Sequence, residues 1–283
     1  MIVFRTKAEL ARFAAETRRQ GKVIGLVPTM GYLHAGHMSL VDTARARADV
    51  VIVTLFVNPT QFGPTEDLDR YPRDFERDKQ MCEDHKVDVL FAPDTTEMYA
   101  EDSSTWIEET DLAKPLCGAS RPAFYRGVTT VVGKLFHLAQ PDFACFGLKD
   151  AQQCFVIERM VRDLDFQVEI VPCPLVRDDD GLALSSRNRY LSADERQRAL
   201  SIHRALLAGR KELEEKGVSA LESICRTAIE SITAAGGRVD YVEGLDRATM
   251  KAPTSDSKEV LLAAAVFFGT TRLIDNELVK VKP

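Results

Sequence analysis

The first part of the chain alternates short apolar runs with amphipathic stretches, as repeated β-α units do. Several apolar runs are continuous in valine, isoleucine, leucine and phenylalanine, which is typical of parallel strands covered on both faces. The predicted strands span residues 23–27, 50–57, 87–92, 143–146 and 168–171, and the predicted helices span 40–48, 75–84 and 151–163. This order predicts an α/β fold, a Rossmann-like doubly wound parallel sheet.

The pattern changes after Pro172-Cys173-Pro174, where two prolines interrupt a helix or a central strand. Two polar helices are predicted at 193–216 and 220–235, and Ser192 with Glu195 has the spacing of a capping box. Three β-like runs follow at 238–245, 260–268 and 272–278. We therefore expect two domains, residues 1–174 and a smaller C-terminal α+β domain, residues 175–283.

Composition and charge narrow the classes of partner. With 283 residues and 45% hydrophobic content, the chain can bury a sizeable core, and its net charge of −6 argues against a broad nucleic-acid surface. The six cysteines are scattered and none forms a C-x-x-C pair, as in proteins of a reducing compartment. No apolar run reaches membrane-spanning length, and the amino terminus does not resemble a secretory signal. A cytoplasmic protein without nucleic-acid or membrane partners is expected.

Two histidines follow the first predicted strand within a glycine-bearing turn. His34 and His37 are three residues apart at the start of an expected helix, and Gly31 and Gly36 let the backbone approach a nucleotide. Paired imidazoles beside a helix N-terminus would stabilise the charge that develops during nucleotidyl transfer. Two alternatives remain: the histidines merely cap a helix, or they bind zinc, although no Glu follows His34 as in H-E-x-x-H.

Two further polar segments follow later strands, at the edge where open α/β sheets bind ligands. Asn58 and Gln61 carry amides that both donate and accept, which suits an acceptor substrate. Lys149 can neutralise phosphate, Asp150 can accept ribose hydroxyls or cap a helix, and Gln153 lies one helical turn after Asp150. The alternative for the first segment is a polar turn without a ligand.

A hydroxyl-rich basic segment lies near the expected domain junction. Ser185, Ser186 and Arg187 place two hydroxyls beside a fixed cation, which resembles a mobile phosphate clamp. The alternative is a solvated surface loop.

Together these segments closely resemble the pantoate–β-alanine ligase family of the nucleotidyltransferase superfamily. The resemblance extends through residues 69–73, 126–132 and 185–192, and covers most of the first 192 residues. It implies that (R)-pantoate attacks the α-phosphorus of ATP, that pyrophosphate leaves, and that β-alanine then displaces AMP from pantoyl adenylate. It further implies a homodimer, Mg²⁺ with the ATP, and a lid role for the C-terminal domain; the protein ligands of the metal are unknown.

The resemblance also implies roles for individual residues. His37 would donate a proton, His34 would contact phosphate, and Gln61 would bind pantoate and border the β-alanine site, with Asn58 beside it. Gln153 would hold pantoate from the opposite side. The residues implied in ATP binding are Met30, Gly31, Tyr32, Leu33, His34, Ala35, Gly36, His37, Gly147, Leu148, Lys149, Asp150, Val176, Leu184, Ser185, Ser186 and Arg187. Among these, catalytic roles fall to His34, His37, Lys149, Ser185, Ser186 and Arg187.

This sequence departs from the usual family pattern at Tyr32, Phe124, Leu148 and Leu184. Two other functions stay open at this point. One is a nucleotidyltransferase that acts on another small acceptor, and the other is a nucleotide-sensing module without catalysis. The paired amides of Gln61 and Gln153 favour the ligase, because they suit a hydroxy-acid acceptor.

Overall fold

The computed structural model of the protein describes residues 1–64 and 66–281, which fall into two compact units. The first unit comprises residues 1–113, 121–148 and 152–174. The second comprises 114–120, 149–151 and the chain from 175 onward, so two short stretches join it although the chain on either side belongs to the first unit. Residues 282–283, at the end of the second expected domain, lie outside the described residues.

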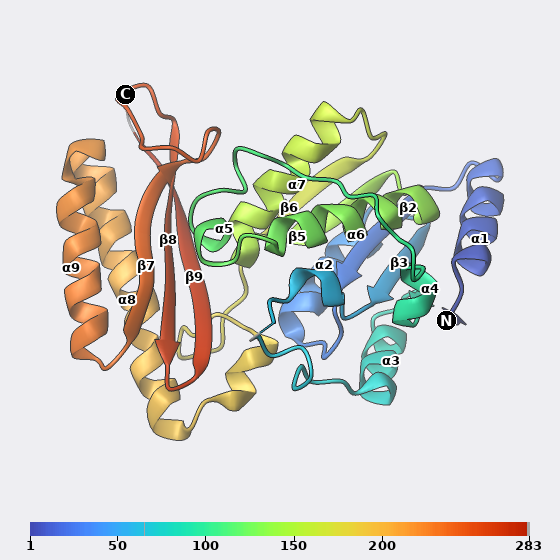
Figure 1. Ribbon diagram of the computed structural model, residues 1–283, viewed down its shortest axis with the longest axis horizontal. Helices are drawn as coiled ribbons and strands as arrows, with labels where there is room; N and C mark the ends of the chain where they lie inside the picture. Colours follow the sequence, from blue (N-terminus) through green and yellow to red (C-terminus); the bar gives the residue numbers. More distant parts are fainter. Residues whose placement is uncertain (65, 282–283) are drawn as a thin grey trace. The chain divides into compact units, whose positions relative to one another are not determined.

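The first unit contains a six-stranded parallel sheet in the order β1-β4-β3-β2-β5-β6. Figure 1 labels its strands β2, β3, β5 and β6. Its strands are β1 (Ile2–Phe4), β2 (Ile24–Thr29), β3 (Val50–Leu55), β4 (Val89–Phe91), β5 (Phe143–Gly147) and β6 (Glu169–Cys173). The apolar runs predict all of these except β1, which is too short to have a period. β6 includes Pro172, which an edge strand tolerates because one side of its backbone needs no ladder bond.

Helices surround this sheet. They are α1 (Lys7–Arg19), α2 (Ala35–Arg45), α3 (Phe75–Asp84), α4 (Thr95–Met98), α6 (Phe124–Ala139) and α7 (Ala151–Asp163). The predictions for α3 and α7 are confirmed, whereas the predicted start of α2 at residue 40 is five residues late. The start of α2 explains the error, because its first three residues, Ala35-Gly36-His37, include no large apolar side chain. None of the helices in the described ranges is long and apolar enough to cross a membrane.

The sheet is covered by helices that carry matching apolar faces. Val27 of β2 and Val53 of β3 are paired in register and form one buried cluster with Val41 of α2 and Cys82 of α3. Helices α1 and α6 pack together and against β2. The predicted doubly wound α/β fold is confirmed, and it places the loops that follow β2, β3 and β5 at one edge of the sheet.

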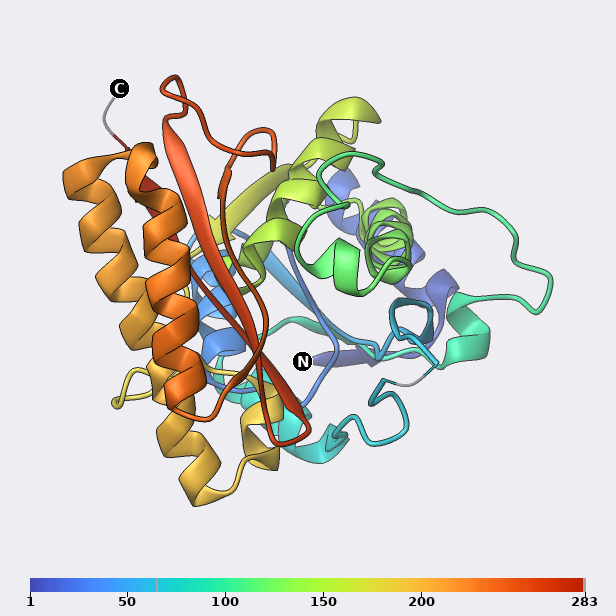
Figure 2. The same cartoon turned by 60° about the vertical axis from the view of Figure 1, so that its left-hand side comes forward.

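The second unit has an antiparallel three-stranded sheet with two long helices beside it (Figure 2). The strands are β7 (Arg238–Asp246), β8 (Glu259–Phe268) and β9 (Thr271–Lys280), and the helices are α8 (Ala193–Lys216) and α9 (Leu221–Ala234); α5 (Cys117–Ser120) also belongs here. Ser192 and Glu195 form the predicted capping box of α8. Leu206, Ile232 and Leu262 lie in the core between helices and sheet. The predicted α+β character of this part is confirmed.

Candidate functional site

Three loops leave the first sheet beside its central strand. β2 pairs with β3 on one side and with β5 on the other, and all three strands are parallel. The chain runs from β2 to β3 and returns only later to β5, so the direction of winding reverses at β2. Open α/β sheets bind ligands at such a switch point, beyond the carboxyl ends of the strands. The predicted segments 30–37, 58–61 and 147–148 all begin there.

The loop after β2 is fixed to β3 before it reaches the histidines. Thr29 Oγ1 donates to the carbonyl oxygen of Thr54 at 2.6 Å and accepts from the amide of Gly31 at 3.2 Å. Gly31 then adopts φ +86° and Tyr32 adopts φ +50°. These two left-handed residues turn the chain toward α2, for which His34 is the N-cap. The sequence thus places both histidines at the amino end of an eleven-residue helix.

The two histidine rings lie against each other at the start of α2. Their centroids are 4.0 Å apart, and the backbone amide of His34 donates to Nδ1 of His37 at 3.3 Å. Because Nδ1 is an acceptor in this arrangement, a neutral His37 ring carries its proton on Nε2. That N–H can donate a hydrogen bond to an anion. The structure therefore brings the predicted pair together and gives His37 a defined tautomer.

A buried carboxylate of α3 holds the same loop. Asp78 Oδ2 accepts from the amide of Tyr32 and Oδ1 accepts from the amide of Leu33, each at 2.7 Å. Burial raises the pKa of Asp78, although the two amide bonds and Arg77 lower it in part. Asp78 is not among the site residues that the sequence pattern predicts. Its signal is its position, one turn before Cys82 on the buried face of an amphipathic helix, where a carboxylate needs partners.

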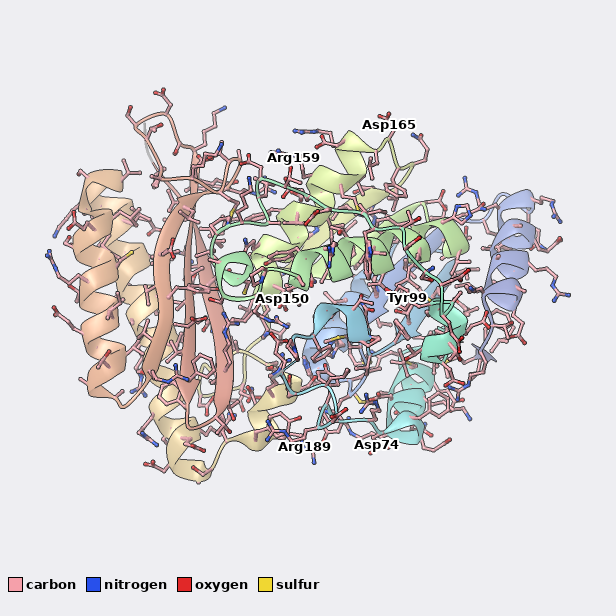
Figure 3. The ribbon with its side chains drawn as sticks, in the orientation of Figure 1. Asp74, Tyr99, Asp150, Arg159, Asp165 and Arg189 are labelled. Carbon is pink, nitrogen blue, oxygen red and sulfur yellow. The ribbon has the colours of Figure 1, made fainter. Side chains whose placement is uncertain are left out.

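Asn58 organises the loop after β3. Its side chain is 1% exposed, and its Nδ2 donates to Oε1 of Gln61 at 3.2 Å and to the carbonyl oxygen of Gly127 at 3.0 Å. Its Oδ1 accepts from the hydroxyls of Thr60 at 2.9 Å and Tyr99 at 3.0 Å. Tyr99 follows α4 (Figure 3), and burial raises its pKa, so its hydroxyl keeps the proton that it donates. Asn58 therefore orients Gln61 from inside the protein.

Gln61 connects the loop after β3 to the loop after β2. Its Nε2 donates to the Sδ of Met30 at 2.9 Å, while its Oε1 accepts from Asn58. The Gln61 side chain is largely buried. The structure thus brings a predicted acceptor-site residue into direct contact with a predicted ATP-site residue.

Helix α6 approaches this loop at Gly127, where no side chain fits. A Cβ on Gly127 would lie 2.5 Å from the carbonyl oxygen of Thr60 and 2.7 Å from the amide nitrogen of Gln61. Contacts this short would push the two backbones apart. In the sequence Gly127 is only one member of the motif at residues 126–132. The structure shows why a side chain at this position would clash with the backbone of the loop.

Phe124, at which the sequence departs from the family pattern, supports the same loop indirectly. The Arg121 guanidinium lies over the Phe124 ring, 3.9 Å from its centroid. Arg121 also pairs with Glu66, and its Nη2 donates to the carbonyl oxygen of Gln61 at 3.1 Å. The aromatic ring therefore orients a cation that binds the backbone of the acceptor-side loop.

The loop after β5 is divided between the two units. Gly147 and Leu148 belong to the first, whereas Lys149 and Asp150 belong to the second. Within the second unit, Lys149 Nζ lies 3.6 Å from Asp150 Oδ2, and the carbonyl oxygen of Lys149 accepts from Asn276 of β9 at 2.9 Å. Asp150 is labelled in Figure 3. The predicted basic and acidic residues of this segment are therefore an ion pair braced by β9.

Two adjacent glutamines in the first turn of α7 have different surroundings. Gln152 is buried, and its Nε2 donates to the carbonyl oxygen of Leu112 at 2.9 Å. Gln153, the residue that the resemblance implies in pantoate binding, is only half-buried. The helical phase thus leaves Gln153 as the more accessible amide.

The predicted phosphate clamp follows a narrow hairpin in the second unit. The amide of Leu184 donates to the carbonyl oxygen of Val176 at 3.0 Å, which pairs the two arms. Ser185 then caps the short helix η3 (Ser186–Tyr190), and its Oγ accepts from the amide of Arg187 at 3.2 Å. Residues 184–187 are half-buried, unlike Arg189, which is exposed on the same helix (Figure 3). The structure brings these predicted residues together.

A buried ion pair anchors this hairpin to β9. Arg177 contacts Asp275 through two hydrogen bonds, from Nη1 to Oδ2 at 2.6 Å and from Nη2 to Oδ1 at 3.0 Å. The Asp275 side chain is 3% exposed, and Glu277 lies 3.3 Å from the same guanidinium. This bidentate geometry fixes the direction as well as the distance of the contact. Val176 is among the predicted site residues, but its neighbour Arg177 is not.

Arg196 of α8 binds the tip of the same hairpin. Its Nη2 lies 2.8 Å from a carboxylate oxygen of Asp178 and 2.8 Å from one of Asp180.

Throughout residues 1–64 and 66–281, no three histidine, cysteine, aspartate or glutamate side chains form a group that could hold a metal ion. Within this part of the chain the zinc alternative for His34 and His37 therefore gains no support, and the six cysteines form no disulfide bond.

Comparison with known proteins identifies the family. A sequence model described as pantoate-beta-alanine ligase matches residues 2–278. The chain is 50% identical to the pantothenate synthetase of Thermotoga petrophila, over 98% of this chain and 99% of that protein. The solved pantothenate synthetase of Thermus thermophilus is 44% identical, matches over 100% of both chains and has a TM-score of 0.92.

A third relative is known with ligands. The pantoate-beta-alanine ligase of Francisella tularensis, solved in complex with beta-gamma ATP and beta-alanine, is 33% identical over 98% of this chain and 97% of that one, with a TM-score of 0.81. These matches extend over the whole chain, well past the motifs at the switch point. The chain belongs to the pantoate–β-alanine ligase family.

Proposed function

We propose that this chain ligates pantoate and β-alanine, the activity of its family, in two steps on one ATP. In the first step an oxygen of the (R)-pantoate carboxylate bonds to the α-phosphorus, and the bond from that phosphorus to the bridging oxygen of pyrophosphate breaks. In the second step the β-alanine nitrogen bonds to the acyl carbon, AMP leaves with the carboxylate oxygen, and the nitrogen loses a proton. The substrates supply both nucleophiles, so the protein contributes positioning and electrostatics.

One observation carries this proposal: the contact between Met30 and Gln61. It joins the loop that ends at the histidine pair to the loop that holds the acceptor-type amides, at the switch point of a parallel sheet. An adenylation site needs a nucleotide and an acceptor in direct contact. The Francisella relative was solved with beta-gamma ATP and beta-alanine, and these are ligands that such a site would bind.

The histidine pair is proposed to bind the reacting phosphates. With Nδ1 of His37 occupied by the His34 amide, the Nε2–H of His37 donates to the oxygen that gains charge as pyrophosphate departs. His34, as the N-cap of α2, contributes a second imidazole, and the amides of the first helical turn favour negative charge. The same donors stabilise the carboxylate-bound α-phosphate.

The amides are proposed to bind the acceptors. Gln61, oriented by Asn58, contacts pantoate and borders the β-alanine site, while Gln153 binds pantoate from α7. Carboxamides suit a hydroxy acid because they donate to its carboxylate and accept from its hydroxyls.

The rest of the ATP is proposed to bind residues of three segments. Main-chain groups of 147–150 contact ribose and phosphate, Lys149 neutralises a phosphate charge, and Val176 borders adenine. The complete proposed ATP set is Met30, Gly31, Tyr32, Leu33, His34, Ala35, Gly36, His37, Gly147, Leu148, Lys149, Asp150, Val176, Leu184, Ser185, Ser186 and Arg187. In it, Ser185, Ser186 and Arg187 bind the triphosphate.

Mg²⁺ is proposed to accompany the ATP. The described residues offer no cluster of three carboxylate, thiol or imidazole ligands, and this donor set fits an ion held chiefly by phosphate oxygens and water. When bound, the ion would neutralise charge on the departing pyrophosphate.

Three properties of the whole protein are proposed from the family resemblance: a homodimer, a cytoplasmic location and a lid role for residues 175–283. The six cysteines, which form no disulfide bond within the described residues, suit a reducing compartment. Sedimentation would test the dimer, and ATP should slow hydrogen exchange in 176–187 if this part closes over the nucleotide. Unchanged exchange would contradict the lid role.

The decisive assay measures which products form when all substrates are supplied and when one of them is omitted. With ATP, Mg²⁺, pantoate and β-alanine, AMP and pyrophosphate should form in equal amounts with pantothenate. Without β-alanine, a single turnover should release pyrophosphate and leave acyl adenylate on the protein. Formation of ADP and phosphate would contradict the proposal, as would pyrophosphate release that does not depend on pantoate.

A further inference from the structure

The turn before the histidines contains a backbone conformation that its sequence does not favour. Gly31 and Tyr32 are consecutive residues with positive φ, +86° and +50°. Glycine adopts this region freely, whereas the Cβ of tyrosine crowds the following carbonyl oxygen. Such a residue persists only where its surroundings hold it in place. Groups outside the turn must therefore hold Tyr32.

Asp78 supplies that hold from a different element. It lies 46 positions after Tyr32 in the chain, in α3, and each of its carboxylate oxygens accepts one amide hydrogen bond of 2.7 Å from two consecutive residues, Tyr32 and Leu33. A Cβ on Gly31 would lie 3.2 Å from Oδ2, so the carboxylate also lies directly against the first residue of the turn. Asp78 thus binds the amides of two successive residues and lies beside the glycine that precedes them.

The contact offers an ionised carboxylate two hydrogen-bond donors. Two amides point at one side chain that is 2% exposed, and only a carboxylate gives each an acceptor without presenting a donor of its own. The charged groups near it are Arg77, whose Nη1 lies 3.6 Å from Oδ1, and Asp74 at the start of α3 (Figure 3). Burying a charge with so little compensation is unfavourable for folding alone.

The held backbone leads directly to the histidine pair. His34 follows Leu33, and the amide of His34 donates to Nδ1 of His37. A shift of the peptide at Leu33 would therefore change the direction of the His34 amide, and through it the ring of His37. The two rings are in contact, so both would move.

We propose that Asp78 is a positioning residue for nucleotidyl transfer, which fixes the backbone of Tyr32 and Leu33 so that the histidine pair meets the ATP phosphates. The inference rests on the proposed ATP role of His34 and His37. Asp78 itself touches no reacting atom.

The first test compares two isosteric substitutions on one helix. Asp78→Asn keeps the shape but turns an amide donor toward one of the two backbone amides. We expect it to lower kcat/KM for ATP by about a hundredfold, the effect of misplacing catalytic groups, with an unchanged KM for β-alanine. Asp74→Asn is the control, because asparagine is also a good N-cap, and it should stay within about twofold of the parent.

The second test asks whether the loss comes from the strained residue. Adding Tyr32→Gly to Asp78→Asn should recover about tenfold in kcat/KM for ATP, because glycine adopts φ +50° without the strain of a side chain. A merely structural role of Asp78 would instead show recovery of the free energy of unfolding without recovery of kcat/KM, because glycine at position 32 also relieves strain in the fold.

The outcomes separate this inference from the proposed function. If His37→Ala abolishes turnover while Asp78→Asn stays within about threefold of the parent, the positioning role is wrong and the histidine role stands. If Asp78→Asn lowers all kinetic parameters alike and Tyr32→Gly recovers none of the lost kcat/KM, the role is structural and the inference is also wrong.

A measurement on the unmodified protein covers the case in which the variant does not fold. The amides of Tyr32 and Leu33 should be among the slowest to exchange with solvent in residues 30–37, because both are bound to a buried carboxylate. Fast exchange at both positions would overturn the proposal.

Discussion

Two segments of this protein that are proposed to bind ATP are each held by a buried aspartate, but the aspartates have different partners. Asp78 binds two uncharged amides of the loop that leads to the histidine pair. Asp275 binds the guanidinium of Arg177, which lies in the hairpin before the predicted phosphate clamp. An amide-bound carboxylate fixes the backbone itself, whereas an ion pair mainly compensates charge. Loss of Asp78 should therefore act on catalysis, and loss of Asp275 on stability.

The largest effect expected from this comparison is that of Asp275→Ala. It removes the bidentate partner of Arg177, which keeps its contact with Glu277, and should lower the free energy of unfolding by about 3 kcal/mol. Urea unfolding followed by circular dichroism measures it. The double variant Arg177→Met/Asp275→Leu removes both charges and should recover most of the loss. A loss below about 1 kcal/mol for Asp275→Ala would contradict the ion-pair account.

A matched pair of glycine substitutions gives the next effect. Gly31 and Gly181 both have positive φ, +86° and +96°, one in each held segment. Alanine at either position should cost about 1–3 kcal/mol of stability through backbone strain. Only Gly31→Ala should also lower kcat/KM for ATP more than the stability loss explains, because its Cβ meets Asp78. Equal kinetic losses in both variants would remove the distinction.

Arg196→Gln should have a smaller effect. Its ion pairs with Asp178 and Asp180 are partly exposed and screened by solvent, so we expect a loss of about 0.5 kcal/mol. The loss should shrink as salt is added, whereas the effect of Asp275→Ala should persist, because the buried pair is less screened. A loss for Arg196→Gln that does not depend on salt would contradict the view that solvent screens the ion pairs of Arg196.

The smallest effect is a pH dependence of stability at Asp78. Burial raises its folded pKa above the ordinary 3.8, so the folded state takes up the proton more readily than the unfolded state. The group's contribution is therefore greatest below 3.8 and is lost as pH rises through the folded value. The difference in unfolding free energy between the parent and Asp78→Asn should fall over that window. A difference that rises with pH would contradict the direction of the shift.

Much of the fold follows from local sequence patterns. Continuous apolar runs predict five of the six strands of the parallel sheet, and the capping residues Ser192 and Glu195 predict the start of α8. The errors have physical reasons. Ala35, Gly36 and His37 include no large apolar side chain, so the start of α2 shows no apolar period, and the three-residue β1 is too short for a pattern.

The site is predictable where its residues follow a strand directly. His34, Gln61 and Lys149 each lie within a few residues of a strand end, and the topology of an α/β sheet places such ends together. Asp78 and Asp275 could not be predicted, because their partners are 46 and 98 residues away in the chain. A sequence can indicate that an acidic residue lies on the buried face of a helix or strand. It does not show which amide or cation that residue contacts.

The most direct test of the whole account follows an oxygen atom. Pantoate labelled with ¹⁸O in its carboxylate should transfer one label to AMP in each turnover, because the attacking oxygen stays on the α-phosphorus when β-alanine takes the acyl group. Mass spectrometry of the AMP measures this transfer. One label in AMP is the predicted result; unlabelled AMP, or a label in inorganic phosphate, would contradict the acyl-adenylate route.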